Sequence, residues 1–220
     1  MEGVRGPSLP RPRHPVDLVG ALAAAALGIF VIHSAFGGFI LPPSDTGWML
    51  SGRIGPDPVQ YWLGWTAFAR DVWRWPPGAN PGWGMELASS VFYSDSIPLV
   101  AFLFKALRPV LEVSQYWGLW IYACGALQAM LAWALIGRAT RDPLARLAVA
   151  GLFVLQPLLL GRLGGHFALG GQFLLLMGLW LCVTPGKGAR RGLAWAALMA
   201  AAALVQAYLL PMVGALWAAD

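Results

Sequence analysis

The chain has 220 residues, of which 58% are hydrophobic and only 11% are charged, and its mean hydropathy is +0.63. Soluble domains contain about 25% charged residues, so this composition excludes an ordinary soluble domain and indicates an all-α polytopic membrane protein. The formal net charge is +5, but the basic residues form short clusters between apolar runs, which argues against a nucleic-acid partner.

The chain begins with a polar, proline-rich segment, residues 1–16. Proline at this density is incompatible with a helix, so we expect a short disordered tail. Residues 17–41 follow almost without charge and predict the first transmembrane helix. A cleaved signal peptide is the alternative, but the apolar run of about 24 residues exceeds the 7–15 residues that are typical of a signal peptide.

Four later apolar runs also predict transmembrane helices: 115–137, 146–161, 168–184 and 192–217. Basic clusters at 138–146 and 187–191 separate some of them, and positive charge in short loops marks the cytoplasmic side. We therefore expect a membrane domain over 17–220 with five crossings and a cytoplasmic N-terminus. Residues 42–114 then form a long external loop, and residues 161–167 form an external turn.

The apolar run 97–111 is not expected to cross the membrane. It has about 15 residues, fewer than the roughly 20 that a spanning helix needs, and it contains Lys105 and Arg108. We expect it to lie along the outer leaflet. Because the chain ends at Asp220, directly after an apolar run, we also expect an N-terminal fragment of a longer polytopic protein.

The external loop contains two predicted interfacial helices. The first starts at Asp57-Pro58, because Asp at the N-cap and Pro at the next position are strong start signals. Its tryptophans follow helical spacing, which is typical of a helix in the membrane interface. The second starts after Asp95. Each of these aspartates is interpreted either as an N-cap or as a functional carboxylate, and one residue can serve as both.

A second polar constellation is the predicted external turn Gly161-Arg162-Leu163-Gly164-Gly165-His166-Phe167. Arg162 and His166 could hold a phosphate there, and Lys105 is a third cation predicted on the same face. The alternatives are that Arg162 and Lys105 extend to lipid headgroups and that His166 caps the turn.

This order of segments resembles the GT-C class of integral-membrane glycosyltransferases. Asp57-Pro58-Val59-Gln60-Tyr61 stands where that class has an acidic motif before an interfacial helix, and Ser96-Ile97-Pro98-Leu99 stands at its second interfacial helix. Gly137-Arg138 matches its basic cytoplasmic turn, and Gly161–His166 matches its second external motif. The chain also resembles a set of uncharacterised bacterial membrane proteins that have the same DPxQYxLGW and GHFAL stretches.

The resemblance implies transfer of a sugar, with inversion, from a polyprenyl-phosphate donor to an envelope or surface-glycan acceptor. The reaction would take place on the outer face of the bacterial cytoplasmic membrane. Asp57 would be the catalytic base, and the residues expected to bind substrate or phosphate are Arg162, His166, Lys105, Asp95 and Gln60. The chain departs from the family pattern in having Asp-Pro for Asp-Glu and His166 for Asp. These departures argue against the metal coordination of some relatives. A divalent metal is possible, but no ligand motif supports it, and the cofactor is unknown.

Two other classes of function remain open. A transporter or lipid flippase would use polar groups at mid-membrane, for which the candidates are Gln128, Gln156, Gln172 and Gln206. We interpret these glutamines instead as bridges between neighbouring helices. The third alternative is a non-catalytic scaffold in the cell envelope.

Overall fold

The computed structural model describes residues 14–220, and their side chains from Leu18 onward. Most of the predicted tail lies outside the described residues, although the first helix begins at His14 rather than at residue 17. The helices are α1 (His14–Phe36), η1 (Gly38–Ile40), α2 (Gly47–Leu50), α3 (Asp57–Arg70), η2 (Met85–Leu87), α4 (Pro98–Leu107), α5 (Trp117–Ile136), α6 (Pro143–Leu155), α7 (Pro157–Leu163), η3 (Phe167–Gly170), α8 (Phe173–Val183), α9 (Ala189–Val205) and α10 (Leu209–Ala219). The strands β1 (Ala79–Asn80) and β2 (Ser89–Ser90) form a short antiparallel pair.

Helix α5 is the central helix of the bundle and packs against α1, α6 and α8. It crosses α1 at small residues. A Cβ atom added to Gly28 would lie 2.3 Å from the Gly125 carbonyl oxygen, and one added to Gly125 would lie 2.3 Å from Ile32. Small residues at a crossing let two helix backbones approach closely, as is common in membrane bundles. The predicted runs 17–41 and 115–137 thus form one tightly packed pair.

Length and composition support membrane association. Leu18–Phe36 and Trp117–Ile136 are long and apolar enough to span a bilayer. Helices α6 and α7 count as a third span if they are taken together, with a bend of 47° between them at Gln156-Pro157. Pro157 cannot donate the hydrogen bond that would continue α6, which accounts for the break. Among the described residues, two or three spans meet these criteria of length and composition, and the predicted count of five is not confirmed.

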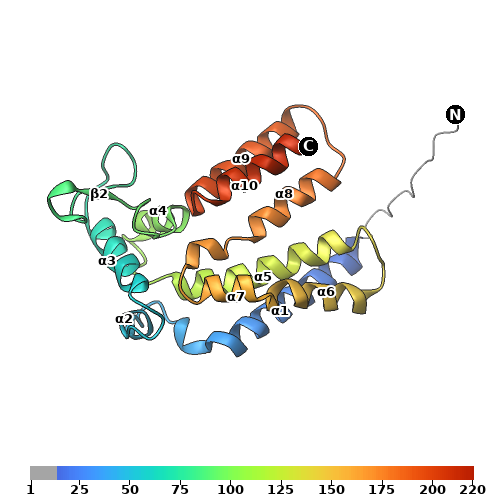
Figure 1. Ribbon diagram of the computed structural model, residues 1–220, viewed down its shortest axis with the longest axis horizontal. Helices are drawn as coiled ribbons and strands as arrows, with labels where there is room; N and C mark the ends of the chain where they lie inside the picture. The colour runs from blue at the N-terminus through green and yellow to red at the C-terminus, as the bar shows by residue number, and fades with distance from the viewer. Residues whose placement is uncertain (1–13) are drawn as a thin grey trace, which may run out of the picture.

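The predicted single crossing 192–217 is wrong, because this run forms two antiparallel helices. Helix α9 ends at Val205, the chain turns at Gln206, and α10 runs back beside it (Figure 1). The Asp220 carboxylate pairs with Arg191 and accepts a hydrogen bond from Trp195 Nε1 at 2.9 Å. One continuous helix would place residues 192 and 217 about 38 Å apart, which is incompatible with these contacts.

The basic turns gather at one end of the bundle (Figure 1). Arg138 donates to the carbonyl of Val183 at the end of α8, and Arg191 donates to the carbonyl of Thr184. The α7–η3 turn and the α9–α10 turn lie at the opposite end. Residues 14–220 therefore make six helical passes along the bundle: α1, α5, α6 with α7, η3 with α8, α9 and α10.

The predicted external loop is a structured lobe of residues 37–116, here called the end lobe, at the end of the bundle opposite the basic turns (Figure 1). Helix α3 packs against α4, and the side chain of Arg108, the residue after the end of α4, donates to the Ala69 carbonyl of α3 at 2.6 Å. Helix α4 has ten residues, or about 15 Å, which is too short to span a bilayer. Helix α4 is therefore not a candidate span by length, and the position of the run 97–111 along the outer leaflet stays a prediction.

Candidate functional site

Asp57 is the first residue of α3, but its side chain does not cap the helix. Pro56 occupies the N-cap position, and no side-chain hydrogen bond is made there. Pro58 follows at the start of the helix, where its missing N–H group has no helical partner in any case. The N-cap interpretation of Asp57 is therefore wrong, and its carboxylate is available for other contacts.

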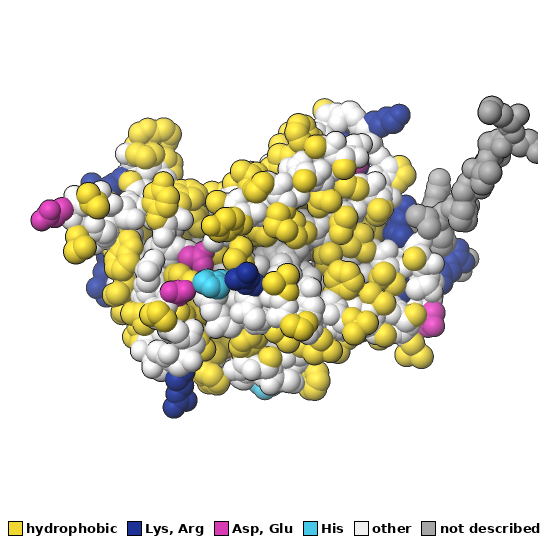
Figure 2. Space-filling view, viewed as in Figure 1, with side chains coloured by type: hydrophobic (Ala, Val, Ile, Leu, Met, Phe, Trp, Pro, Cys, Tyr) yellow, Lys and Arg dark blue, Asp and Glu magenta, His cyan; other side chains and the backbone are white. Residues whose placement is uncertain are grey.

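The Asp57 carboxylate faces His166, which lies in the turn between α7 and η3. His166 Nδ1 is 3.8 Å from Asp57 Oδ2, and both side chains are 49% exposed. The Tyr61 hydroxyl, one helical turn after Asp57, lies 3.5 Å from the same ring nitrogen. The structure thus joins the two polar constellations of the sequence. Acidic, histidine and basic side chains adjoin one another in the hollow between the end lobe and the bundle (Figure 2).

Asp95 belongs to the same cluster and is not a helix cap either. The N-cap of α4 is Ile97, which makes no side-chain cap. Instead, Asp95 Oδ1 accepts a hydrogen bond of 2.7 Å from Nε2 of Gln206, in the turn between α9 and α10. This contact ties the end lobe to the last helical hairpin.

Burial and neighbouring charges shift the pKa values of two groups in the cluster. Burial raises the pKa of Asp95 from 3.8 to about 6, opposed by His166 and by the Tyr61 hydroxyl and assisted by the charge of Asp57. Burial, together with the charges of Asp95 and Asp57, raises the pKa of Tyr61 well above 10. At neutral pH, Asp95 is mostly ionised and Tyr61 keeps its proton, so Tyr61 can donate a hydrogen bond.

A pocket of about 570 Å³ opens beside this cluster. Its polar lining comes from Asp95, Arg162, His166, Gln172 and Gln206, together with the ring of Tyr208. Its apolar lining consists of Leu158, Leu169, Leu175, Leu209 and Met212. Among the described residues, no side chain pairs with the Arg162 guanidinium. The pocket therefore combines an available cation with a continuous apolar wall.

Comparison with known proteins adds a family but no activity. The family model described as "Domain of unknown function (DUF6311)" matches residues 25–220. The chain belongs to the DUF6311 family. Comparison with curated proteins and with solved structures gave no match. The matched range contains every residue of the cluster, from Asp57 to Gln206.

Two of the predicted site residues of this DUF6311 protein lie apart from the cluster. Lys105 Nζ donates to the Val72 carbonyl at 3.2 Å and lies 3.9 Å from the centre of the Phe68 ring, near the far end of α3. It therefore holds α4 against α3, and the expectation that it binds substrate phosphate is not supported by its position. Gln60 is exposed on α3 and is not among the residues that line the 570 Å³ pocket.

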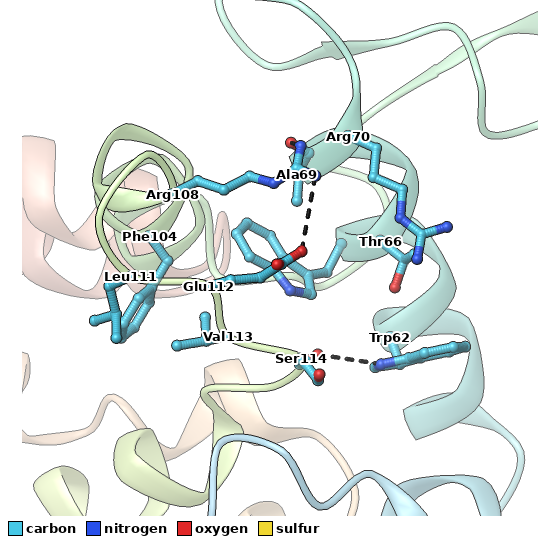
Figure 3. Close-up of a pocket in the computed structure, with 11 residues that line it drawn as sticks. Trp62, Thr66, Ala69, Arg70, Phe104, Arg108, Leu111, Glu112, Val113 and Ser114 are labelled. Atoms are coloured by element: carbon cyan, nitrogen blue, oxygen red, sulfur yellow. Dashed lines mark hydrogen bonds and ion pairs between the residues drawn. The ribbon is translucent and has the colours of Figure 1, made fainter.

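Two further pockets border the end lobe of the DUF6311 protein. One, of about 80 Å³, lies between α3 and the segment 104–114, where Trp62 Nε1 donates to the Ser114 carbonyl at 3.1 Å (Figure 3). The other, of about 430 Å³, is mostly apolar and is lined by the end of α1, by Trp48 and by Phe167. Neither contains Asp95 or His166, which both line the 570 Å³ pocket. Asp57 is not among the residues that line that pocket, but its carboxylate lies 3.8 Å from His166 at the edge of it. The 570 Å³ pocket is therefore the candidate site.

Sequence reasoning gave Tyr61 no role in substrate binding, and it named Gln172 and Gln206 only as candidate polar groups of a transporter, interpreted as bridges between helices. Tyr61 follows Asp57 by four residues, so helical spacing places both on one face of α3, and this signal was present in the sequence. Gln172 was predicted to bridge helices, and it accepts a hydrogen bond of 3.0 Å from Gln156. No local signal pairs Gln206 with Asp95, which is 111 residues away in the chain.

The two carboxylates and the histidine of the cluster are not arranged as a metal site. Within the part of the chain that the structure describes, no group of three or more His, Cys, Asp and Glu side chains could hold a metal ion.

Proposed function

We propose that this DUF6311 protein is an integral-membrane glycosyltransferase. It would move a sugar from a polyprenyl-phosphate donor to an envelope or surface-glycan acceptor on the extracytoplasmic face of a bacterial cytoplasmic membrane. The observation that carries the proposal is the 570 Å³ pocket, in which Arg162 and His166 stand beside an apolar wall. The resemblance of the sequence to the GT-C class is a second, independent support.

The pocket suits an amphiphilic donor. An anionic phosphate would sit at Arg162, whose planar guanidinium matches phosphate oxygens, with His166 beside it. A polyisoprenyl chain would lie along the leucines and Met212. Leu158 and Met212 are 60% and 50% exposed, so a lipid could enter this side of the pocket directly from the bilayer.

The transfer needs a proton acceptor and a stabiliser of negative charge. The acceptor hydroxyl attacks the anomeric carbon and gives its proton to the Asp57 carboxylate, which is exposed enough to meet an incoming substrate. The bond between the anomeric carbon and the phosphate oxygen breaks, and its electron pair leaves with the lipid phosphate. Arg162 and His166 stabilise the charge that develops there. One displacement inverts the anomeric configuration.

The test is the Asp57→Asn variant, assayed in membranes with a radiolabelled polyprenyl-phosphate sugar. Loss of the base should slow donor consumption by about 10²- to 10⁴-fold without loss of protein from the membrane. Asp71→Asn is the matched control, because Asp71 follows the other end of α3 and pairs with exposed Arg74. Near-normal transfer by Asp57→Asn would contradict the assignment of the base.

A lipid flippase or transporter is the second candidate, and the break between α6 and α7 favours it. Broken helices beside a polar site are common in transporters, and the bend here is 47°. Reconstituted vesicles separate the two functions. A transferase consumes the labelled donor, whereas a flippase moves it across the bilayer chemically unchanged.

A further inference from the structure

Asp95 is held in one position by contacts that are independent of Asp57. Gln206 Nε2 donates to Asp95 Oδ1 at 2.7 Å, and Gln206 Oε1 accepts from the Ala207 backbone N–H at 2.7 Å. The second bond fixes which end of the amide faces the carboxylate. An ionised carboxylate can accept about four hydrogen bonds. Gln206 and the Tyr61 hydroxyl use two of them, so acceptor capacity remains for a ligand.

The backbone around Asp95 is also strained. Asp95 and Ile97 have φ angles of 48° and 49°, in a region that a β-branched residue such as Ile97 rarely adopts. Ser94 and Ser96 are fully buried. Their hydroxyls lie 2.8 Å apart, and Ser96 Oγ donates to the Tyr61 carbonyl at 3.2 Å. Strain that the surrounding structure maintains in this way is common at binding and active sites.

The polar groups around Asp95 match the hydroxyls of a sugar. Asp95 accepts hydrogen bonds, and Gln172 can donate them, because its Oε1 is occupied by Gln156 while its NH₂ group carries two donors. Tyr208 is 70% exposed and lines the same pocket, where its ring can cover a sugar face. Arg162, a cation that lines the same pocket, can bind the phosphate of the donor.

We infer that Asp95, which is held by Gln206, binds the hydroxyls of the donor sugar together with Gln172. The same geometry implies that this sugar is uncharged. A neutral hexose or deoxyhexose presents hydroxyls that can donate to Asp95. A uronic acid would bring a carboxylate against Asp95, with Asp57 nearby, in a partly buried site where like charges repel strongly. This inference rests on the proposed function and specifies its substrate class.

The test uses purified protein in nanodiscs, with an envelope-glycan fraction as acceptor and three donors: polyprenyl phosphate carrying glucose, mannose or glucuronic acid. The wild-type protein should prefer at least one neutral donor over the glucuronic acid donor by 100-fold or more in kcat/KM. Asp95→Asn should lower kcat/KM for the neutral donor by at least 10-fold and reduce the preference by at least 10-fold. Gln206→Ala should also lower kcat/KM for the neutral donor, because it frees the Asp95 side chain. Glu86→Gln, which changes an exposed carboxylate of the end lobe, is the control and should leave the preference unchanged.

The outcomes separate this inference from the proposed function. If the wild-type protein consumes none of the three donors, the proposed function and the inference both fail. If it consumes the glucuronic acid donor as well as the neutral ones, or if Asp95→Asn leaves the preference unchanged, only the inference is overturned. Should Asp95→Asn fail to fold, the preference of the wild-type protein still decides the question.

Discussion

Burial of Asp95 makes its negative charge unfavourable, and this has a measurable effect on stability. The pKa of Asp95 rises from 3.8 to about 6 in the folded protein, so between these values the folded state binds a proton that the unfolded state has lost. Stability from this group is complete below pH 3.8, falls as pH rises, and is lost above about pH 6. The total change is about 3 kcal/mol.

The Asp95→Asn variant should show this effect directly, because asparagine carries no charge at any pH. Relative to the wild-type protein, we expect its free energy of unfolding to increase by up to about 3 kcal/mol between pH 4 and pH 7. Thermal unfolding in detergent across this range measures the difference. A difference that does not change with pH would contradict the shifted pKa of Asp95.

The sequence predicted Asp57, Arg162 and His166 as neighbours, and the structure brings Asp57 and His166 to 3.8 Å, with Arg162 and His166 lining one pocket. That prediction was possible because the basic turns give the end of the bundle at which each loop lies. The positions of Lys105 and Gln206 were not predictable in this way. Lys105 packs on aromatic rings, and Gln206 contacts Asp95 through packing between distant parts of the chain. Neither contact produces a recognisable pattern in the local sequence.

At the scale of the elements, the close crossing of α1 and α5 depends on Gly28 and Gly125, which have no side chains. Gly28→Ala would place a methyl group 2.3 Å from the Gly125 carbonyl oxygen, so the helices must separate. Overpacking of this kind typically costs about 1–3 kcal/mol. We expect a lower Tm and a smaller monodisperse fraction in size-exclusion chromatography.

Gly214→Ala in α10 is the matched control, because an added Cβ there has nothing within 4 Å. Alanine favours a helix over glycine by about 1 kcal/mol, so this variant should be as stable as the wild-type protein or slightly more stable. Equal destabilisation by the two substitutions would show that the close crossing of α1 and α5 is not the cause.

Sequence reasoning located most helices but misjudged the run 192–217. Its apolar character continues through the turn, and Gln206 and Pro211 are weak signals for a reversal. What sets the hairpin is tertiary contact, from Asp220 to Arg191 at one end and from Gln206 to Asp95 at the other. Composition measures how apolar a helix is, but it does not show where the chain reverses.

At the scale of the whole molecule, the six helical passes predict which ends share a side of the membrane if each pass, the short α10 included, crosses it. The basic turns should be cytoplasmic. Because α10 returns to Arg191, Ala219 should lie on the same side as Arg141, whereas Met85 in the end lobe should lie on the opposite side. Five crossings would instead place Ala219 with Met85.

Single cysteines at these three positions, in a background with Cys124 and Cys182 replaced by alanine, test this arrangement. A membrane-impermeant maleimide added outside intact cells should label Met85→Cys and leave Arg141→Cys and Ala219→Cys unlabelled until the membrane is opened. Labelling of Ala219→Cys from outside would rule out the six-pass arrangement in the membrane.

The hydrogen bond between Gln156 and Gln172 has a consequence for the molecule as a whole. These residues mark the two ends of the segment formed by α7 and η3, which carries Arg162 and His166, and they join to each other at 3.0 Å. One hydrogen bond between two side-chain amides therefore joins the two ends of this segment and closes it into a loop. Loss of this hydrogen bond should allow Arg162 and His166 to change position while the long helices stay folded. We therefore expect the proposed activity to be lost without unfolding of the protein.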